Sequence, residues 1–150
     1  MDDVPVPEDA PVAAPAASTP TVTVVVDVAN VMGSRPDGWW RDRAGAATRL
    51  LAPMPALVGR NVAGPDGERF VVERVVAVVE GAATAVVALD GVDLVRAPAD
   101  GDGSIVATAA ELGTHAARVL VVTADRGLRA RLADDVLVAG PGWLNALLGR

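Results

Sequence analysis

The chain has 150 residues, about the length of one domain, and its hydrophobic content of 51% is enough to build a buried core. It contains no cysteine and a single histidine, which excludes disulfides, thiol catalysis and metal sites built from cysteine or several histidines. The net charge of −6 weakens the case for a nucleic-acid partner without excluding one, because four of the acids lie in the first 20 residues.

Residues 1–20 are rich in proline and alanine and carry acids but no base. This composition is typical of a disordered tail, so we predict a folded domain over residues 21–150 and a tail that folding does not need.

No apolar run approaches the ~20 residues that span a bilayer, and the first residues lack the pattern of a signal peptide. We therefore expect a cytoplasmic protein with no membrane partner.

Strands and helices alternate along the rest of the chain. Residues 21–26 form an uninterrupted β-branched run, typical of a strand buried on both faces of a parallel sheet. The apolar patterns predict further strands at 70–79, 92–95, 118–122 and 136–138, and helices from about 42, at 102–115, after 125 and at the end of the chain. This alternation predicts an α/β fold, a three-layer α/β/α sandwich with a mostly parallel five-stranded sheet.

Acidic residues follow several of these strands. Asp27, Glu80 and Asp125 each come directly after a β-branched run, and Asp102 stands at the start of a helix after another strand. Because the carboxyl ends of parallel strands share one edge, we expect the four carboxylates to converge there and to repel one another unless a cation is bound. Each has an alternative: Asp102 and Asp125 as helix N-caps, and Glu80 as a solvated turn residue. The convergence favours a site containing Asp27, Asp102 and Asp125, and leaves Glu80 open.

Three motifs in this order resemble those of NYN domains, the YacP-like group within the PIN-like ribonuclease superfamily. The stretch VVVDVANVMGS resembles the first motif, a strand that ends in D-x-x-N. GDGSIV resembles the D-x-x-I start of a helix, and VVTADRGLRARL resembles the T-x-D-R-x-L motif. The similarity covers about residues 21–145.

The resemblance implies a Mg²⁺ or Mn²⁺ site at the strand ends. Carried over, Asp27, Asp102 and Asp125 are metal ligands and catalytic residues, and Asn30 is a catalytic residue that orients the metal or a water. The shared sheet edge adds Glu80 as a further candidate ligand, and oxygen ligands suit both cations. The sequence departs from the family at Gly103, since relatives often carry a second acid after the one that corresponds to Asp102.

Four residues near the first and third motifs are candidate substrate contacts: Ser34, Arg35, Thr123 and Arg126. Arginine can hold phosphate bidentately, although a solvated loop or helix surface is the alternative for both arginines.

We predict a ribonuclease that hydrolyses RNA phosphodiester bonds with a metal-activated water. The alternatives are a nucleoside triphosphate pyrophosphohydrolase that uses the same acids, and a non-catalytic module that binds RNA or a protein. The identity of the RNA and the formation of a homodimer are left open.

Overall fold

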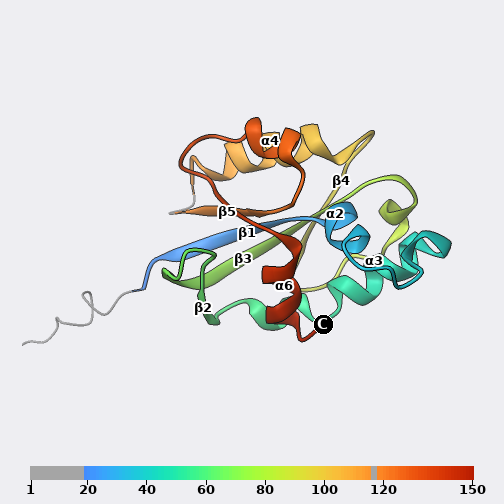
Figure 1. The fold of residues 1–150 in the computed structure, drawn as a ribbon, viewed down its shortest axis with the longest axis horizontal. Helices are drawn as coiled ribbons and strands as arrows, with labels where there is room; N and C mark the ends of the chain where they lie inside the picture. The colour runs from blue at the N-terminus through green and yellow to red at the C-terminus, as the bar shows by residue number, and fades with distance from the viewer. Residues whose placement is uncertain (1–18, 116–117) are drawn as a thin grey trace, which may run out of the picture.

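The computed structural model describes residues 19–115 and 118–150, which form a central sheet covered by helices (Figure 1). The strands are β1 (Thr21–Asp27), β2 (Asn61–Ala63), β3 (Arg69–Val79), β4 (Asp93–Arg96), β5 (Val119–Val122) and β6 (Leu137–Ala139). The α-helices are α2 (Val28–Gly33), α3 (Arg43–Leu51), α4 (Gly101–Leu112), α5 (Arg126–Ala130) and α6 (Pro141–Leu148). Short 3₁₀ turns occupy η1 (Trp39–Arg41), η2 (Met54–Leu57) and η3 (Gly81–Ala85).

Five of the strands are parallel, in the order β4, β3, β1, β5, β6. The chain builds the sheet outward from β1 to one side, through β3 and β4, and then returns to add β5 and β6 on the other side. This order makes the β1–β5 junction a topological switch point, the place where open α/β sheets bind their ligands beyond the carboxyl ends of the strands.

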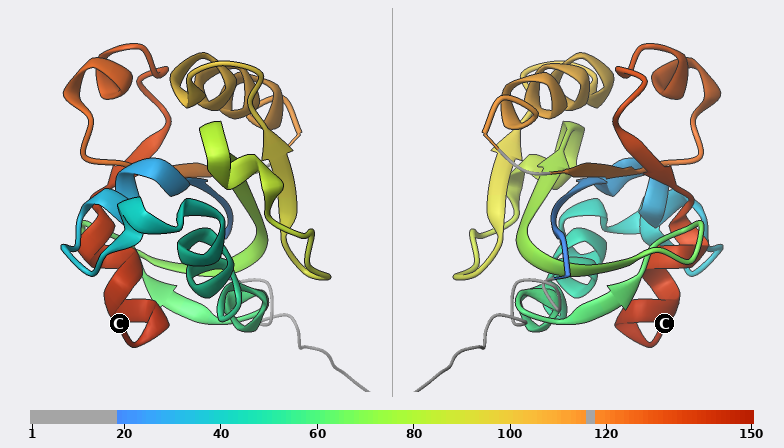
Figure 2. Two further views of the ribbon diagram at one scale, coloured as in Figure 1. Left: turned by 90° about the vertical axis from the view of Figure 1, so that its right-hand side faces the viewer. Right: turned by 90° about the vertical axis from the view of Figure 1, so that its left-hand side faces the viewer.

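The alternation of side chains along the strands explains why the sheet is covered on both faces. In β1, Val22, Val24 and Val26 face one core, which α2, α3 and α6 complete. Val25 faces a second core, which α4 and α5 complete. The two end-on views show these helices on opposite sides of the sheet (Figure 2). A strand that is apolar on both faces is what this arrangement requires, and the β-branched sequence of β1 supplies it.

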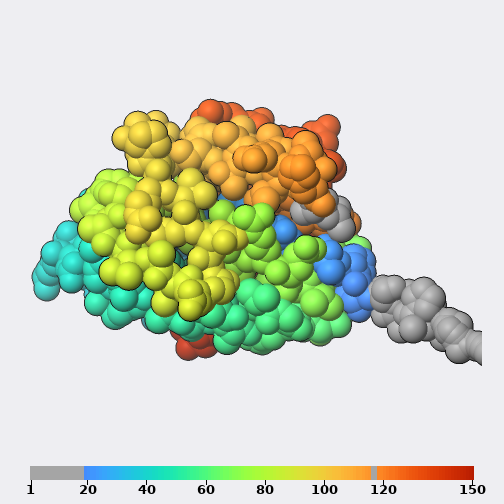
Figure 3. All heavy atoms as spheres, turned by 180° about the vertical axis from the view of Figure 1, so that it is seen from behind, coloured from blue at the N-terminus to red at the C-terminus, as the bar shows by residue number. Residues whose placement is uncertain are grey.

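The α/β sandwich with a mostly parallel sheet is confirmed. Two elements are additional to the expected ones: β2 pairs antiparallel with the first half of β3, and the six-residue α2 begins directly after Asp27, where no helix was predicted. Seen from behind, the segment around β4 and helix α4 lie on the surface that faces the viewer (Figure 3). Residues 1–18 of the predicted tail, which was expected to span residues 1–20, lie outside the described part of the chain. No helix among the described residues has the length and hydropathy to cross a membrane.

Candidate active site

The four acids of interest converge, as the shared sheet edge predicts. Asp27, Glu80, Asp102 and Asp125 line one open pocket of about 240 Å³, together with Ala29 and Asn30. Asp27 ends β1, Glu80 follows β3, Asp102 lies in the first turn of α4, and Asp125 follows β5. The pocket is therefore at the carboxyl edge of the sheet, beside the switch point between β1 and β5.

Asp27 is held firmly in this pocket. It is only 5% exposed, and both of its carboxylate oxygens accept hydrogen bonds. Oδ1 accepts from the backbone N–H of Asn30 at 3.2 Å, which makes Asp27 the N-cap of α2. Oδ2 accepts from the hydroxyl of Thr123 at 2.9 Å, across the junction between β1 and β5. Strand pairing and capping thus fix the orientation of this carboxylate.

Asn30 and Thr123 join the first motif to the third. The side-chain oxygen of Asn30 accepts a hydrogen bond from the backbone N–H of Ala124 at 2.7 Å. The hydroxyl of Thr123, which is fully buried, also accepts from the backbone N–H of Asp125 at 3.1 Å. Asn30 therefore lines the pocket and also holds the loop that carries Asp125, while Thr123 positions Asp27 and does not reach the surface.

Asp125 is the N-cap of α5, because its Oδ1 accepts the backbone N–H of Leu128 at 3.0 Å. This bond occupies one carboxylate oxygen, so the capping role is compatible with a second role in the pocket. The guanidinium of Arg129 stabilises the same turn by donating two hydrogen bonds to the carbonyl oxygen of Thr123, at 3.0 and 3.2 Å. Arg126 is exposed at the first position of α5, beside Asp125.

The alternatives for Asp102 and Glu80 are both wrong. Helix α4 begins at Gly101, and its N-cap is Asp100, whose Oδ1 accepts the backbone N–H of Asp102 at 3.1 Å. The carboxylate of Glu80 is half-buried and accepts the backbone N–H of Gly101. A Cβ at position 101 would collide with Glu80, so glycine allows this close approach. Glu80 thus ties the end of β3 to the start of α4.

The pocket concentrates negative charge, which Arg131 offsets only in part. Burial raises the pKa of Asp27; hydrogen bonds from Thr123 and Asn30 partly oppose this, and repulsion from Asp102 and Glu80 adds to it. The pKa of Asp102 is also raised, by burial and then by repulsion from Asp125 and Asp100, while Arg131 opposes the increase. A divalent cation would relieve this repulsion.

The donor set of this pocket fits a hard cation, since its side chains present carboxylate and amide oxygens. Within the described ranges, however, no three acidic or histidine side chains already form a group that could hold a metal ion. The acids would have to draw closer together around a bound ion.

Ser34 and Arg35 do not line the acidic pocket. They lie at the other end of α2 from Asp27, where the hydroxyl of Ser34 donates to the carbonyl oxygen of Val31 at 2.6 Å. Next to them, Trp39 packs against the core, whereas Trp40 is 51% exposed. Sequence patterns gave no reason to place residues 34 and 35 away from the first motif, because the intervening α2 was not predicted.

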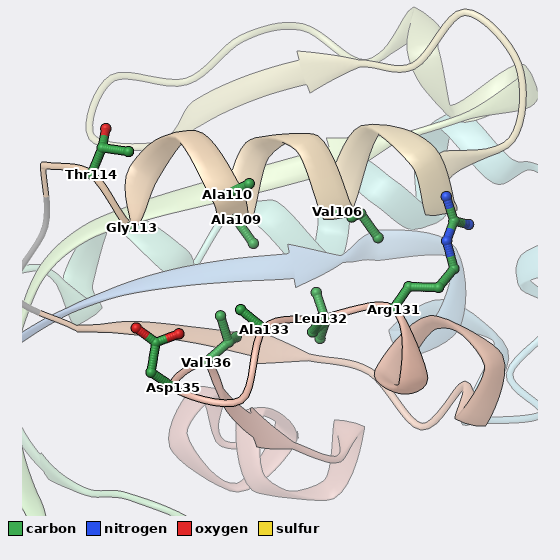
Figure 4. Close-up of a pocket in the computed structure, with 10 residues that line it drawn as sticks. All are labelled: Val106, Ala109, Ala110, Gly113, Thr114, Arg131, Leu132, Ala133, Asp135 and Val136. Atoms are coloured by element: carbon green, nitrogen blue, oxygen red, sulfur yellow. The ribbon is translucent and has the colours of Figure 1, made fainter.

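A larger hollow, of about 460 Å³, lies between α4 and the segment 131–136 (Figure 4). Its walls are mostly apolar side chains such as Val106, Leu132 and Val136. Arg131 reaches from one end of this hollow towards the first turn of α4, on the side of Asp102 (Figure 4). Arg131 carried no signal in the sequence, since its place beside Asp102 depends on how α4 and α5 are arranged.

The fold and the site together define an α/β domain with a mostly parallel sheet and acids at the carboxyl edge of that sheet. Two solved structures share this fold: Rae1 (YacP) from Bacillus subtilis and a single-substitution mutant of it. Both give a TM-score of 0.61, at 16% identity for the former and 19% for the mutant. The matches cover 85–86% of this chain and 73–76% of the solved chains. The YacP-like fold implied by the three motifs is thus confirmed. No family model and no curated protein matches the sequence.

Replacing Thr123 with valine is expected to destabilise the protein by about 1–3 kcal/mol, because it leaves a buried carboxylate oxygen and the N–H of Asp125 without their partner. Urea denaturation measures this loss. Thr48→Val is the matched control, since the Thr48 hydroxyl donates to the carbonyl oxygen of Ala44 on an exposed helix face. The control should change stability by no more than about 0.5 kcal/mol. Equal losses in both variants would show that the Thr123 hydroxyl does not hold the site together.

Proposed function

We propose that this protein is a metal-dependent ribonuclease that hydrolyses RNA phosphodiester bonds. The observation that carries the proposal is the convergence of Asp27, Asp102 and Asp125 from three separate segments into one pocket at the switch point. The shared fold with Rae1 (YacP) and the three NYN-like motifs support the same class of activity.

In this proposal Asp27, Asp102 and Asp125 hold Mg²⁺ or Mn²⁺, with Glu80 as a further ligand. The bound cation supplies a water of lowered pKa and neutralises charge on the phosphate. Thr123 and the N–H of Asn30 orient the Asp27 carboxylate and partly oppose the burial that raises its pKa. Asn30 orients the ligands and holds the Asp125 loop, and the exposed Arg126 is placed to meet a phosphate group.

A second candidate is a non-catalytic module that binds RNA or a protein. Two observations favour it: the acids do not already form a group of three ready to hold a metal in the described part of the chain, and glycine stands at position 103. A domain of this kind would keep the fold and the pocket but would not hydrolyse RNA.

The test is a calorimetric titration with Mg²⁺ and Mn²⁺, followed by incubation with single-stranded RNA, single-stranded DNA and nucleoside triphosphates. The proposal expects binding at millimolar metal and cleavage of RNA that EDTA abolishes. Release of pyrophosphate from triphosphates alone would identify a pyrophosphohydrolase instead. Absence of metal binding would contradict metal-dependent hydrolysis and support the non-catalytic module.

Gly103→Asp is expected to increase metal affinity and RNA cleavage, because it places a second acid beside Asp102. The substitution is sterically open, since a Cβ at position 103 would meet no atom within 4 Å. Calorimetry and cleavage assays in Mn²⁺ measure the gain. Gly103→Asn, which adds similar bulk without charge, is the control. The role proposed for the missing acid would be contradicted if both variants behaved alike.

A further inference from the structure

Two adjacent tryptophans and two arginines form an aromatic cluster in the segment that follows α2. The rings of Trp39 and Trp40 meet in a T-shaped arrangement, with centroids 5.9 Å apart and an angle of 89° between their planes. The guanidinium of Arg43 lies over the Trp39 ring at 5.1 Å, and that of Arg41 lies over the Trp40 ring at 5.9 Å. We refer to these four residues as the Trp–Arg cluster. Each ring is held by its neighbours in a defined orientation.

Packing accounts for two of the three tryptophans and leaves Trp40 without such a role. Trp39 packs against the core, and so does Trp143, whose indole N–H also donates to the carbonyl oxygen of Ala63 at 2.9 Å. Trp40 is 51% exposed, and it is the only aromatic residue among the exposed large apolar side chains of residues 19–115 and 118–150. A rigid indole that is open to solvent is typical of a binding surface.

The Trp–Arg cluster adjoins the face of α2 that lines the acidic pocket. Ala29 and Asn30 line that pocket, and Gly33 follows them by four and three residues, so all three lie on one face of the helix. A Cβ at Gly33 would lie 3.8 Å from Cζ2 of Trp39, so the indole packs at this face about one helical turn, ~5 Å, beyond Asn30. The exposed ring of Trp40 comes next. A nucleic-acid strand that leaves the pocket along α2 therefore reaches the cluster within a few nucleotides.

The local charge is opposite to that of the whole chain. Residues 35–49 contain four arginines and two aspartates, although the protein has a net charge of −6. Of the two aspartates, Asp37 pairs with Arg150 at 3.7 Å, and Asp42 caps α3. The segment thus combines positive charge with aromatic rings, the two features with which proteins bind single-stranded nucleic acids.

We propose that the Trp–Arg cluster binds unpaired RNA bases, with one base stacked on the exposed ring of Trp40. The inference rests on the proposed function, because it takes the acidic pocket as the place where that RNA is cut. In a duplex the faces of each base are covered by its neighbours, so stacking on Trp40 selects single-stranded RNA. Since every base has such a face, the cluster does not select a sequence.

The experiment compares two labelled oligoribonucleotides of equal length in EDTA, one with bases and one abasic. Both carry the same phosphates, so the ratio of their dissociation constants, measured by fluorescence anisotropy, depends on contacts to bases alone. We expect the wild type to prefer the strand with bases by roughly tenfold, the value for one stacked base. Trp40→Leu should abolish this preference, whereas Trp40→Phe keeps an aromatic ring and should retain most of it. An RNA duplex should bind the wild type and Trp40→Leu equally.

Val58→Ala is the matched control. Val58 is 42% exposed, similar to Trp40, and it lies towards the opposite end of the sheet. The residue after it, Gly59, donates to the carbonyl oxygen of Val72, which pairs with Val22 near the start of β1. The substitution removes exposed apolar surface away from the Trp–Arg cluster, so it should keep the wild-type preference. Circular dichroism should give all variants a Tm close to that of the wild type.

The inference is overturned if the wild type binds both strands equally or if the preference survives in Trp40→Leu. A loss of self-association in Trp40→Leu, with RNA binding unchanged, would show that Trp40 contacts a second copy of the chain instead. The two proposals fail separately. A preference for bases that depends on Trp40, without cleavage in Mn²⁺, overturns the ribonuclease function alone. Cleavage in Mn²⁺ with unaltered binding by Trp40→Leu overturns the role of the cluster alone.

Discussion

Asp125→Asn is expected to fold like the wild type and to lose metal-dependent RNA cleavage by orders of magnitude. Asparagine caps a helix about as well as aspartate, so the bond to the N–H of Leu128 survives the substitution. The substitution does remove the negative charge, which a carboxylate needs in order to bind the metal. Cleavage of a labelled single-stranded RNA in Mn²⁺ measures the loss, and circular dichroism verifies the fold.

Asp42→Asn is the matched control for this experiment. Asp42 caps α3 in the same way, with Oδ1 accepting the N–H of Gly45 at 2.9 Å, and it does not line the acidic pocket. The same chemical change at an equivalent cap should leave cleavage at the wild-type rate. If Asp125→Asn also cleaves at that rate, Asp125 is only a cap and its assignment to the metal fails.

Mn²⁺ is expected to raise the Tm of the wild type substantially. A ligand that binds only the native state stabilises it by about 2.7 kcal/mol at 100 times its Kd, and each kcal/mol is worth roughly 2–4 °C for a domain of about this size. Asp102→Asn should show a smaller increase with Mn²⁺. Without metal, the variant should melt slightly above the wild type, because it removes a charge that Asp125 and Asp100 repel.

The pH dependence follows from the same carboxylates. The pKa values of Asp27 and Asp102 are raised in the folded state, so the folded protein binds protons more tightly there than the unfolded chain does. In EDTA these two groups therefore cost stability at neutral pH, and this cost disappears as the pH falls through the raised pKa values. Protons compete with Mn²⁺ for the same oxygens, so the metal-induced increase in Tm should shrink over that range. An increase that does not depend on pH would point to a binding site elsewhere.

The parallel strands and the edge at which their acids meet could be predicted from the sequence. A β-branched run such as residues 21–26 can hardly form anything but a buried strand, and the carboxyl ends of such strands meet by topology alone. The hydrogen-bond partners of Asp27 could not be predicted in this way. Its bond to Thr123 spans 96 residues, and no local pattern encodes which strand end will stand beside it.

Short elements were the main source of error. Helix α2 has six residues without a charge, too few to show a helical period, and β2 has three residues in a region rich in glycine and proline. Missing α2 placed Ser34 and Arg35 beside Asp27, whereas the helix carries them to the end of α6. The start of α4 was predicted at residue 102, one residue after its start at Gly101, because Asp100 and Asp102 are equally suitable for capping in the sequence.

The central position of β1 between β3 and β5 has a consequence for how a new copy of the protein is made. Residues 21–115 contain β1, β3 and β4, but the Thr123 hydroxyl that orients Asp27 emerges 96 residues after it. At 5–20 residues per second, this interval is roughly 5–20 s of translation. Towards the end of that time the nascent chain carries Asp27, Glu80 and Asp102 without the strand that aligns them. The pocket is assembled only when β5 docks against β1, so a partly synthesised chain lacks the aligned carboxylates that the proposed ribonuclease activity requires.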